Sequence, residues 1–477
     1  MVMKSKFSTS SSKPAARGMA AIVLASQIAF ALVLQGANDG YVAHEWGTFT
    51  SIQGGDGVLL NWNGIETSDL PPFVYDWSRP GLERSSPLVF SKSSGYSLQR
   101  METPVIYFYS NKPLRVDVAV EFPLGRITEW FPQAAEIGPS SRPPNRLLTA
   151  LDNTANRVGL HPNPDLVTLF GEPPVTNSII RWKDVAILPA EEHAKLAREL
   201  PTAAERSHYF AARTEDAAFV RVNSIEPTNP APEIEKFLFY RGVGNFQTPL
   251  EVTINESDQI TLSNTGDAPL NQLFAMAIKG EHAMVMPLGQ LDAGQTRDLR
   301  LDTVNASRPA GEALKDISRQ MADALVAEGL YRTEAEAMVN TWRDAWFEDQ
   351  GVRILYLLPR TWTDSVLPIT LNPQPRELVR VMVGRAELIT PGMEAQIRQC
   401  VEGFRQSDPA VKQAALRDFH AMKLGRFAPV GIRLAASRVK DANFYDDGVT
   451  LIEAAAKQET TGTNVSPPAR RLAVRGR

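Results

Sequence analysis

The sequence predicts a mainly β protein with α elaborations, built as a β-sandwich-like body followed by a C-terminal helical region. Apolar and polar residues alternate with a period of two in much of the region 101–305, which is typical of strands with one buried face. The chain contains 34 prolines in 477 residues, and proline favours loops and short strands because it has no N–H to donate. From residue 391 onward the pattern becomes helical.

The strand pattern is clearest near residue 118, where apolar positions alternate with charged or small ones. Residues 236–305 carry several short strands separated by polar turns such as Asn264-Thr265-Gly266-Asp267, so they predict a sandwich-like unit. We expect one set of side chains to face a core together: Leu114, Val116, Val118, Val120 and Phe122.

The rest of the chain divides by composition and periodicity. Thr333-Glu334-Ala335-Glu336 has the form of a capping box, so we expect a helix to open there. The expected segments are an irregular Trp- and Gly-rich stretch at 38–100, a β-rich body at 101–305, a helical hairpin at 306–350, strands at 351–390, a helical region at 391–457 and a disordered tail at 458–477.

Residues 1–37 predict a signal sequence or a membrane anchor. A basic, acid-free start is followed by the apolar run Met19–Leu34 and then by small residues, which is the order found in secretory signals. Sixteen helical residues span about 24 Å, less than the roughly 30 Å hydrocarbon core, so a cleaved signal is favoured over an anchor at 19–34. The expected location is therefore extracytoplasmic, either periplasmic or secreted.

Charge and cysteine content narrow the possible partners. The formal net charge is −4, and the first 37 residues contribute only cations, so the body is more acidic than the whole chain. An acidic body repels phosphate backbones, and nucleic acid is not an expected partner. The single cysteine, Cys400, excludes an intramolecular disulfide and a cysteine-based metal site.

The most distinctive motif is His44-Glu45-Trp46-Gly47-Thr48-Phe49. With this motif the chain resembles a group of uncharacterised, predicted exported bacterial proteins that open with the same signature. Further sequence segments that resemble this group lie at 101–105, 237–242 and 381–385, and the resemblance covers most of residues 41–440. It implies an exported location and no particular mechanism.

The candidates for catalysis are His44, Glu45 and Asp56. Neighbouring residues of a strand point to opposite faces, so His44 and Glu45 would line one site only if the strand were bulged. The zinc motif His-Glu-x-x-His is incomplete because threonine occupies position 48. Two interpretations of His44 are possible. It acts with Asp56 in catalysis or metal binding, or it is a structural histidine that hydrogen-bonds to the backbone.

Two further groups of residues suggest ligands. No cofactor is predicted, although an oxygen-lined Ca²⁺ site is an alternative to ordinary turn chemistry in the Gly-rich region. Clustered tryptophans suit sugar rings, or they pack a loop-rich region. The candidate metal ligands are Asp56, Asn61, Asn63, Glu66 and Asp69, and the candidate ligand-binding aromatics are Trp46, Trp62 and Trp77.

These observations favour an exported or membrane-tethered envelope protein with a macromolecule-binding or structural role, whose partner is a cell-envelope glycan or protein. The sequence contains no complete nucleophile or metal constellation, which is the reason for this preference. The alternative is an extracytoplasmic hydrolase of a polysaccharide or ester. Glycoside hydrolysis needs two carboxylates roughly 5–10 Å apart, so the packing of residues 41–77 discriminates between the two functions.

Overall fold

The computed structural model describes residues 40–64, 70–76, 96–138, 177–189, 193–203, 207–224, 231–300 and 308–462. The predicted signal segment at 1–37 and most of the predicted tail lie outside these residues. No helix among the described residues is long and apolar enough to cross a membrane.

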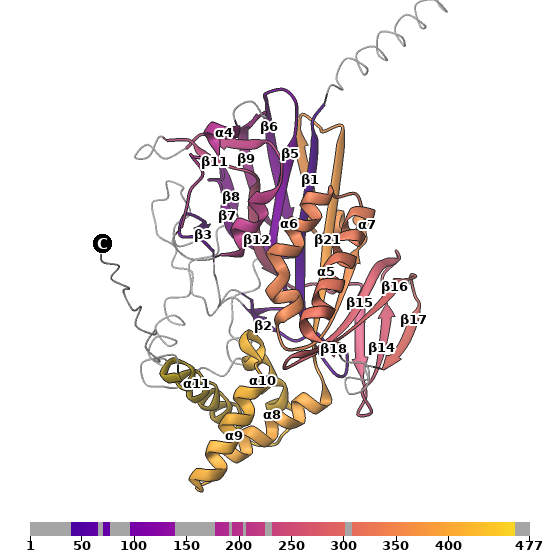
Figure 1. The fold of residues 1–477 in the computed structure, drawn as a ribbon, viewed down its shortest axis with the longest axis vertical. Helices are drawn as coiled ribbons and strands as arrows, with labels where there is room; N and C mark the ends of the chain where they lie inside the picture. The colour runs from indigo at the N-terminus through magenta and orange to yellow at the C-terminus, as the bar shows by residue number, and fades with distance from the viewer. Residues whose placement is uncertain are drawn as a thin grey trace, which may run out of the picture.

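A ten-stranded sheet runs through the molecule (Figure 1). Its central strands β21 and β1 pair in parallel, and the other neighbours pair antiparallel. In spatial order the strands are β18 (Arg308–Pro309), β16 (His282–Leu291), β15 (Leu270–Lys279), β19 (Gly351–Leu358), β21 (Glu377–Ile389), β1 (Val42–Gly54), β5 (Gln99–Tyr109), β12 (Leu238–Gly244), β7 (Gly125–Phe131) and β3 (Tyr75–Asp76).

Three smaller sheets accompany the main sheet. The six-stranded sheet contains β11 (Glu233–Glu235), β10 (Phe219–Val222), β9 (Ser178–Leu188), β6 (Leu114–Phe122) and β20 (Ile369–Asn372), with β8 (Glu136–Gly138) paired to β9. The three-stranded sheet contains β13 (Leu250–Ile254), β14 (Gln259–Asn264) and β17 (Thr296–Arg300). The two-stranded sheet pairs β2 (Trp62–Asn63) with β4 (Tyr96–Ser97).

Two cores lie on opposite faces of the main sheet. One core joins it to the six- and three-stranded sheets, with contributions such as Phe49, Val118 and Val252. The other core joins it to η3 (His208–Thr214), α5 (Ala310–Ala327), α6 (Arg332–Arg343) and the π-helix η4 (Asp344–Glu348). The expectation of a mainly β protein with packed sheets is confirmed.

The remaining helices are short or C-terminal. Two short helices are α4 (His193–Leu196) and α7 (Arg360–Val366). The C-terminal group gathers below the sheet in Figure 1 around a core of its own. It comprises α8 (Pro391–Phe404), α9 (Pro409–Ala421), η5 (Gly425–Phe427), α10 (Ala428–Ser437) and α11 (Phe444–Gly462).

Strand β6 follows the sequence pattern. Val116, Val118, Val120 and Phe122 are buried in the larger core, and Leu114 is half-buried against it. The region 250–300 contributes β13, β14 and β17 to one sheet and β15 and β16 to another across the same core, so it is sandwich-like. β12 does not belong to that unit, because it lies between β5 and β7.

The structure corrects three expected boundaries. Residues 38–100 are not irregular throughout, since β1 occupies thirteen of them at the centre of the main sheet; it is buried on both faces and shows no polar–apolar alternation. The expected strand region 351–390 contains helix α7. Helix α11 extends to Gly462, five residues beyond 457, the expected end of the helical region.

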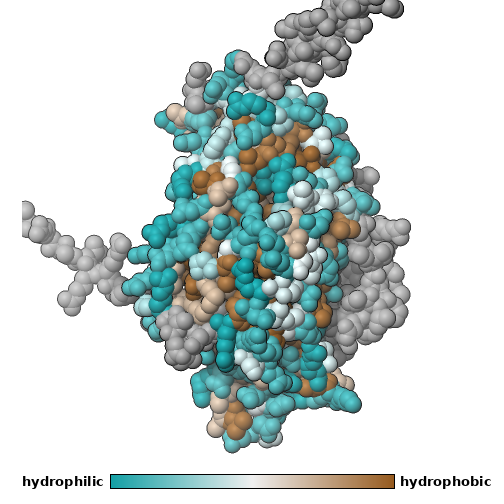
Figure 2. Space-filling model, turned by 90° about the vertical axis from the view of Figure 1, so that its right-hand side faces the viewer, coloured by the Kyte–Doolittle hydropathy of each residue, from teal (hydrophilic) through white to brown (hydrophobic). Residues whose placement is uncertain are grey.

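The surface is predominantly polar on the face shown in Figure 2, and apolar residues appear there in patches between hydrophilic ones. The large hydrophobic side chains that are exposed among the described residues are Val58, Leu124, Tyr331 and Val411. Scattered exposure of this kind is ordinary for a folded protein in water.

Candidate functional site

Strand β1 directs His44 and Glu45 to opposite faces of the main sheet, as the period of a strand requires. Glu45 faces the larger core, where Oε1 accepts a hydrogen bond of 2.5 Å from the Tyr240 hydroxyl and Oε2 one of 2.6 Å from Arg380 Nε. Arg380 also donates to Asp364 over 2.7 Å. Glu45 is therefore half of a fully buried ion pair and not a free carboxylate.

His44 faces α6, where its Nδ1 lies 2.6 Å from Oε2 of Glu334. The same carboxylate oxygen accepts the backbone N–H of Tyr331 over 2.8 Å, which fixes Glu334 at the start of α6. The rings of Tyr331 and Tyr109 lie 4.6 Å and 5.2 Å from the imidazole. We call these residues, together with Glu215, the His44 centre.

Electrostatics in the His44 centre disfavour additional negative charge. Burial, and then the negative charge of Glu334, raise the pKa of Glu215. The same two causes raise the pKa of Tyr109 well above its ordinary value. A histidine held by one carboxylate beside a second, readily protonated carboxyl group can exchange protons, which is the chemistry of general acid–base catalysis. However, His44, Glu215 and Glu334 are at most 2% exposed.

Asp56 does not join His44. It lies beyond the far end of β1, and the ten-residue rise from His44 to Gly54 corresponds to roughly 33 Å. The Asp56 carboxylate pairs at 2.5 Å with Arg438, the residue that follows α10. Burial acts to raise the pKa of Asp56, but the hydrogen bond from Arg438 holds it below its ordinary value. The structure therefore does not bring His44 and Asp56 together.

Of the other candidate metal ligands, Asn61 and Asn63 lie in the described residues. The Asn61 carbonyl accepts a hydrogen bond from Arg433, and Asn63 belongs to β2. Glu66 and Asp69 lie outside the described residues. Within the described part of the chain, no group of three or more His, Cys, Asp and Glu residues is placed to hold a metal ion.

Two of the three candidate tryptophans are enclosed. Trp46 is fully buried in the core beneath α5 and α6. Trp62 is 2% exposed and packs 5.8 Å from the ring of Phe427. Because their rings are covered, these two residues act as packing residues in this structure. Trp77 lies outside the described residues, and it follows the edge strand β3 directly.

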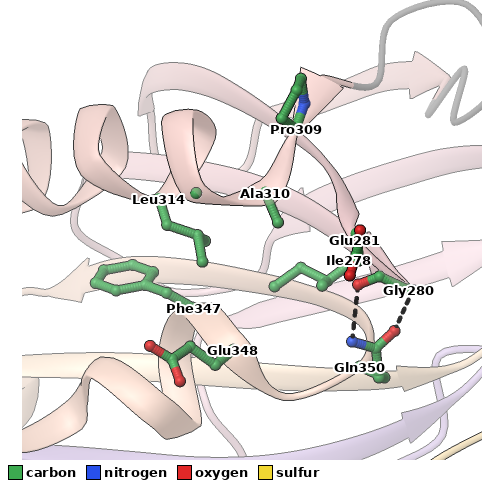
Figure 3. A pocket seen from close by; sticks show the side chains of 10 residues that line it. Ile278, Gly280, Glu281, Pro309, Ala310, Leu314, Phe347, Glu348 and Gln350 are labelled. Atoms are coloured by element: carbon green, nitrogen blue, oxygen red, sulfur yellow. Dashed lines mark hydrogen bonds between the residues drawn. The ribbon is translucent and has the colours of Figure 1, made fainter.

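The described surface contains an open hollow that the sequence analysis did not find (Figure 3). Its volume is about 450 Å³, and it lies between the β15–β16 turn, the start of α5 and the π-helix η4. Ile278, Ala310, Leu314 and Phe347 form its apolar lining. These residues come from three elements that are distant in sequence, so no local motif marks the hollow. We call it the acidic hollow.

Two exposed carboxylates flank the acidic hollow. Glu281 and Glu348 lie on opposite sides of the apolar residues in Figure 3. The turn beside Glu281 is a two-residue connection in which Gly280 has a φ of +61°, a conformation that glycine adopts without strain. Gln350 fixes this turn, because its side chain accepts from the Gly280 N–H over 2.6 Å and donates to the Gly280 carbonyl over 3.4 Å.

Comparisons with known proteins define no family for this chain. No family model matches it, and no curated protein matches it. Among solved structures, it matches the Fcho1 Mu homology domain of Danio rerio with bound Eps15 peptide at 6% identity and a TM-score of 0.23, over 74% of this chain and 99% of that one. A score this low does not indicate a shared fold.

Proposed function

We propose that the chain is an exported or membrane-tethered envelope protein that binds another protein through a basic side chain received in the acidic hollow. The observation that carries this proposal is the hollow itself, which combines an apolar lining with two exposed carboxylates. The signature at His44–Phe49 and the N-terminal segment support the exported location and membership of the exported bacterial group. No cofactor is part of the proposal.

The chemistry of the hollow selects a lysine or arginine side chain. Such side chains carry an apolar stem that packs on hydrophobic surface and a charged head that remains hydrated. The stem would contact Ile278, Leu314 and Phe347, while the head would lie near Glu281 or Glu348.

The start of α5 acts against the binding of a cationic side chain. The N-terminus of a helix carries partial positive charge, which opposes a cationic ligand. Glu312 in the first turn of α5 offsets that charge, and the Ala310 N–H is already bound to the Glu281 carbonyl over 2.8 Å. Glu312 therefore adds a third carboxylate near the opening of the hollow, and the Ala310 N–H is not available to a ligand.

The test is a panel of short peptides with a central lysine, arginine, norleucine or glutamate, measured against the purified full chain by calorimetry. We expect lysine and arginine peptides to bind more tightly than norleucine, and glutamate not to bind. The double variant Glu281→Lys with Glu348→Lys should lose the preference, whereas the matched reversal of two exposed acids elsewhere, Glu121→Lys with Glu402→Lys, should keep it. Equal binding of all four peptides would refute the proposal.

A second candidate function, an extracytoplasmic hydrolase, rests on the His44 centre. His44 and Glu334 form a dyad in which a carboxylate orients an imidazole, and Glu215 adds a carboxyl group with a raised pKa. Hydrolysis of aryl esters or aryl glycosides by the parent protein, lost in His44→Gln and retained in Glu45→Gln, would favour it. If the folded parent protein hydrolyses none of these substrates, the hydrolase hypothesis is excluded.

A further inference from the structure

The helix-covered face of the main sheet changes from apolar to polar along β1. Trp46 packs under α5 and α6, whereas Thr48 and Thr50, further along the strand, are buried polar residues on the same face. Thr50 is paired with Arg385 of β21, and Thr48 with Glu102 of β5. Directly paired residues of neighbouring strands share a face, so these side chains form one buried polar surface.

The C-terminal helical region closes this surface with Arg426. Its Nη1 donates to Glu102 over 2.6 Å. The guanidinium groups of Arg385 and Arg426 both lie over the Phe427 ring, at 5.3 Å and 5.1 Å from its centre. Both cations therefore contact the same aromatic ring. We call Thr48, Thr50, Glu102, Arg385 and Arg426 the Arg–Thr cluster.

Four buried donors in the Arg–Thr cluster have no hydrogen-bond partner within the structure as described: the hydroxyls of Thr48 and Thr50, Nη1 of Arg385 and Nη2 of Arg426. The Arg385 side chain is completely enclosed. Leaving a buried donor unsatisfied costs roughly 1–3 kcal/mol, and more for a charged group. Four such atoms from adjoining positions need acceptors from outside the chain, such as water or an ion.

We propose that the Arg–Thr cluster is a binding site for a tetrahedral oxyanion, either a free phosphate or sulfate or the phosphate group of a larger molecule. Such an anion has acceptors on every side, so it can receive two hydroxyls and two guanidinium groups at once, and arginine is the residue best suited to bind it. Arg385 is paired with Glu387 and Asp349, and Arg426 is paired with Glu102, so the donors left for an anion are Nη1 of Arg385 and Nη2 of Arg426 together with the two hydroxyls.

The electrostatics of a neighbouring residue agree with this assignment. Burial, together with the positive charges of Arg241 and Arg426, lowers the pKa of Arg100 to about 9 against the opposing effect of Glu102. An anion bound beside Arg426 would relieve this repulsion. Glu102 remains the internal counter-ion of Arg100 and Arg426.

The experiment titrates the full chain with inorganic phosphate, sulfate and glycerol phosphate at constant ionic strength, with chloride as the reference salt, and follows the melting temperature and the heat of binding. We expect saturable stabilisation by at least one of the three. Preference for glycerol phosphate over inorganic phosphate would assign the anion to a larger molecule, and the reverse preference would assign it to the free ion.

The deciding variant is Thr48→Val with Thr50→Val, which removes two unpaired hydroxyls and no charge. We expect it to fold, as judged by far-UV circular dichroism, and to bind the anion at least about tenfold more weakly, the loss of roughly 1.4 kcal/mol that two hydrogen bonds can account for. Thr341→Val is the matched control, because that buried hydroxyl already donates to the Ala337 carbonyl.

Three results would contradict the proposed anion site. Absence of saturable stabilisation by all three anions would overturn the proposal. Binding that is unchanged in the double valine variant would also overturn it, because the anion would then occupy a different part of the surface, as an adventitious ion only. Binding that weakens equally in Thr341→Val would show a general effect of stability and would count against the site.

Discussion

At the scale of single residues, this protein places charges inside its core and pairs them there. Glu45 and Arg380 are both fully enclosed and meet at 2.6 Å. Removing ions from water is expensive, so such a pair adds little net stability when it is intact. It is costly to break, because the surviving partner becomes an uncompensated buried charge.

We therefore expect Arg380→Met to lower the free energy of unfolding by about 3–5 kcal/mol, since Glu45 would keep only the Tyr240 hydroxyl. Combining it with Glu45→Gln should recover part of the loss. Urea unfolding at neutral pH measures both effects. The control is Arg115→Met, whose ion pair with Asp184 is more than half exposed and should contribute less than about 1 kcal/mol. A similarly small loss for Arg380→Met would contradict the account.

Glu102 makes stability depend on pH. Burial acts to raise its pKa, but Arg426, Arg100 and Arg385 lower it from 4.5 to about 2. A depressed pKa means that the unfolded chain binds the proton first as the pH falls. The stabilisation is thus complete above the unfolded pKa and is lost as the pH falls toward the folded pKa. It amounts to an order of 3 kcal/mol.

The variant Glu102→Gln checks this prediction. Its free energy of unfolding should lie below that of the parent at about pH 7, and the difference should shrink as the pH is lowered toward about 3. Denaturant unfolding at several pH values provides the measurement. A difference that stays constant over this range would show that the Glu102 carboxylate is not selectively stabilised in the folded state.

At the scale of elements, β6 behaves as its sequence predicts. Val118 is 1% exposed in the larger core, opposite Trp182 of β9 and Leu371 of β20. Val118→Asp would bury an unpaired charge and should lower stability by about 3–5 kcal/mol. Glu121→Ala on the exposed face should be nearly neutral. A variant Val118→Asp that melts within a degree or two of the parent would show that this facing is wrong.

Strand β1 shows why sequence reasoning failed at the centre of the sheet. Alternation is a signal only when one face of a strand meets water, and β1 is buried on both faces. Several of its polar residues have distant partners, such as Gln53, which accepts from the Val252 N–H and donates to the Leu250 carbonyl. In the local sequence, a buried strand with several polar residues has the same composition as a loop, because the partners of those residues are distant in the chain.

At the scale of the whole molecule, the mainly β body and the C-terminal helices could be predicted, whereas the sites could not. His44 and Glu45 were expected on opposite faces, but their partners Glu334 and Arg380 lie 290 and 335 positions away. The acidic hollow likewise assembles from the β15–β16 turn, α5 and η4. Local periodicity determines elements, and no periodicity encodes which elements meet.

Export is a further prediction for the whole chain. Met19–Leu34 is apolar apart from Ser26 and Gln27, and the charged residues that precede it are all cationic. A reporter that works only outside the cytoplasm, fused after Gly40, should be active with the native segment and silent with Val23→Arg and Leu24→Arg. A silent reporter with the native segment, together with full-length protein in the cytoplasmic fraction, would remove the proposed location.

The most direct test of the central claim places a photo-cross-linking amino acid at Leu314, in the lining of the acidic hollow, in the full chain within cells. We predict light-dependent cross-links to an extracytoplasmic protein, mapped beside a lysine or arginine, that disappear with Glu281→Lys and Glu348→Lys. The same group at Glu402, on an exposed face of α8, provides the background. Cross-links no stronger than this background, or cross-links only to cytoplasmic proteins, would contradict the claim.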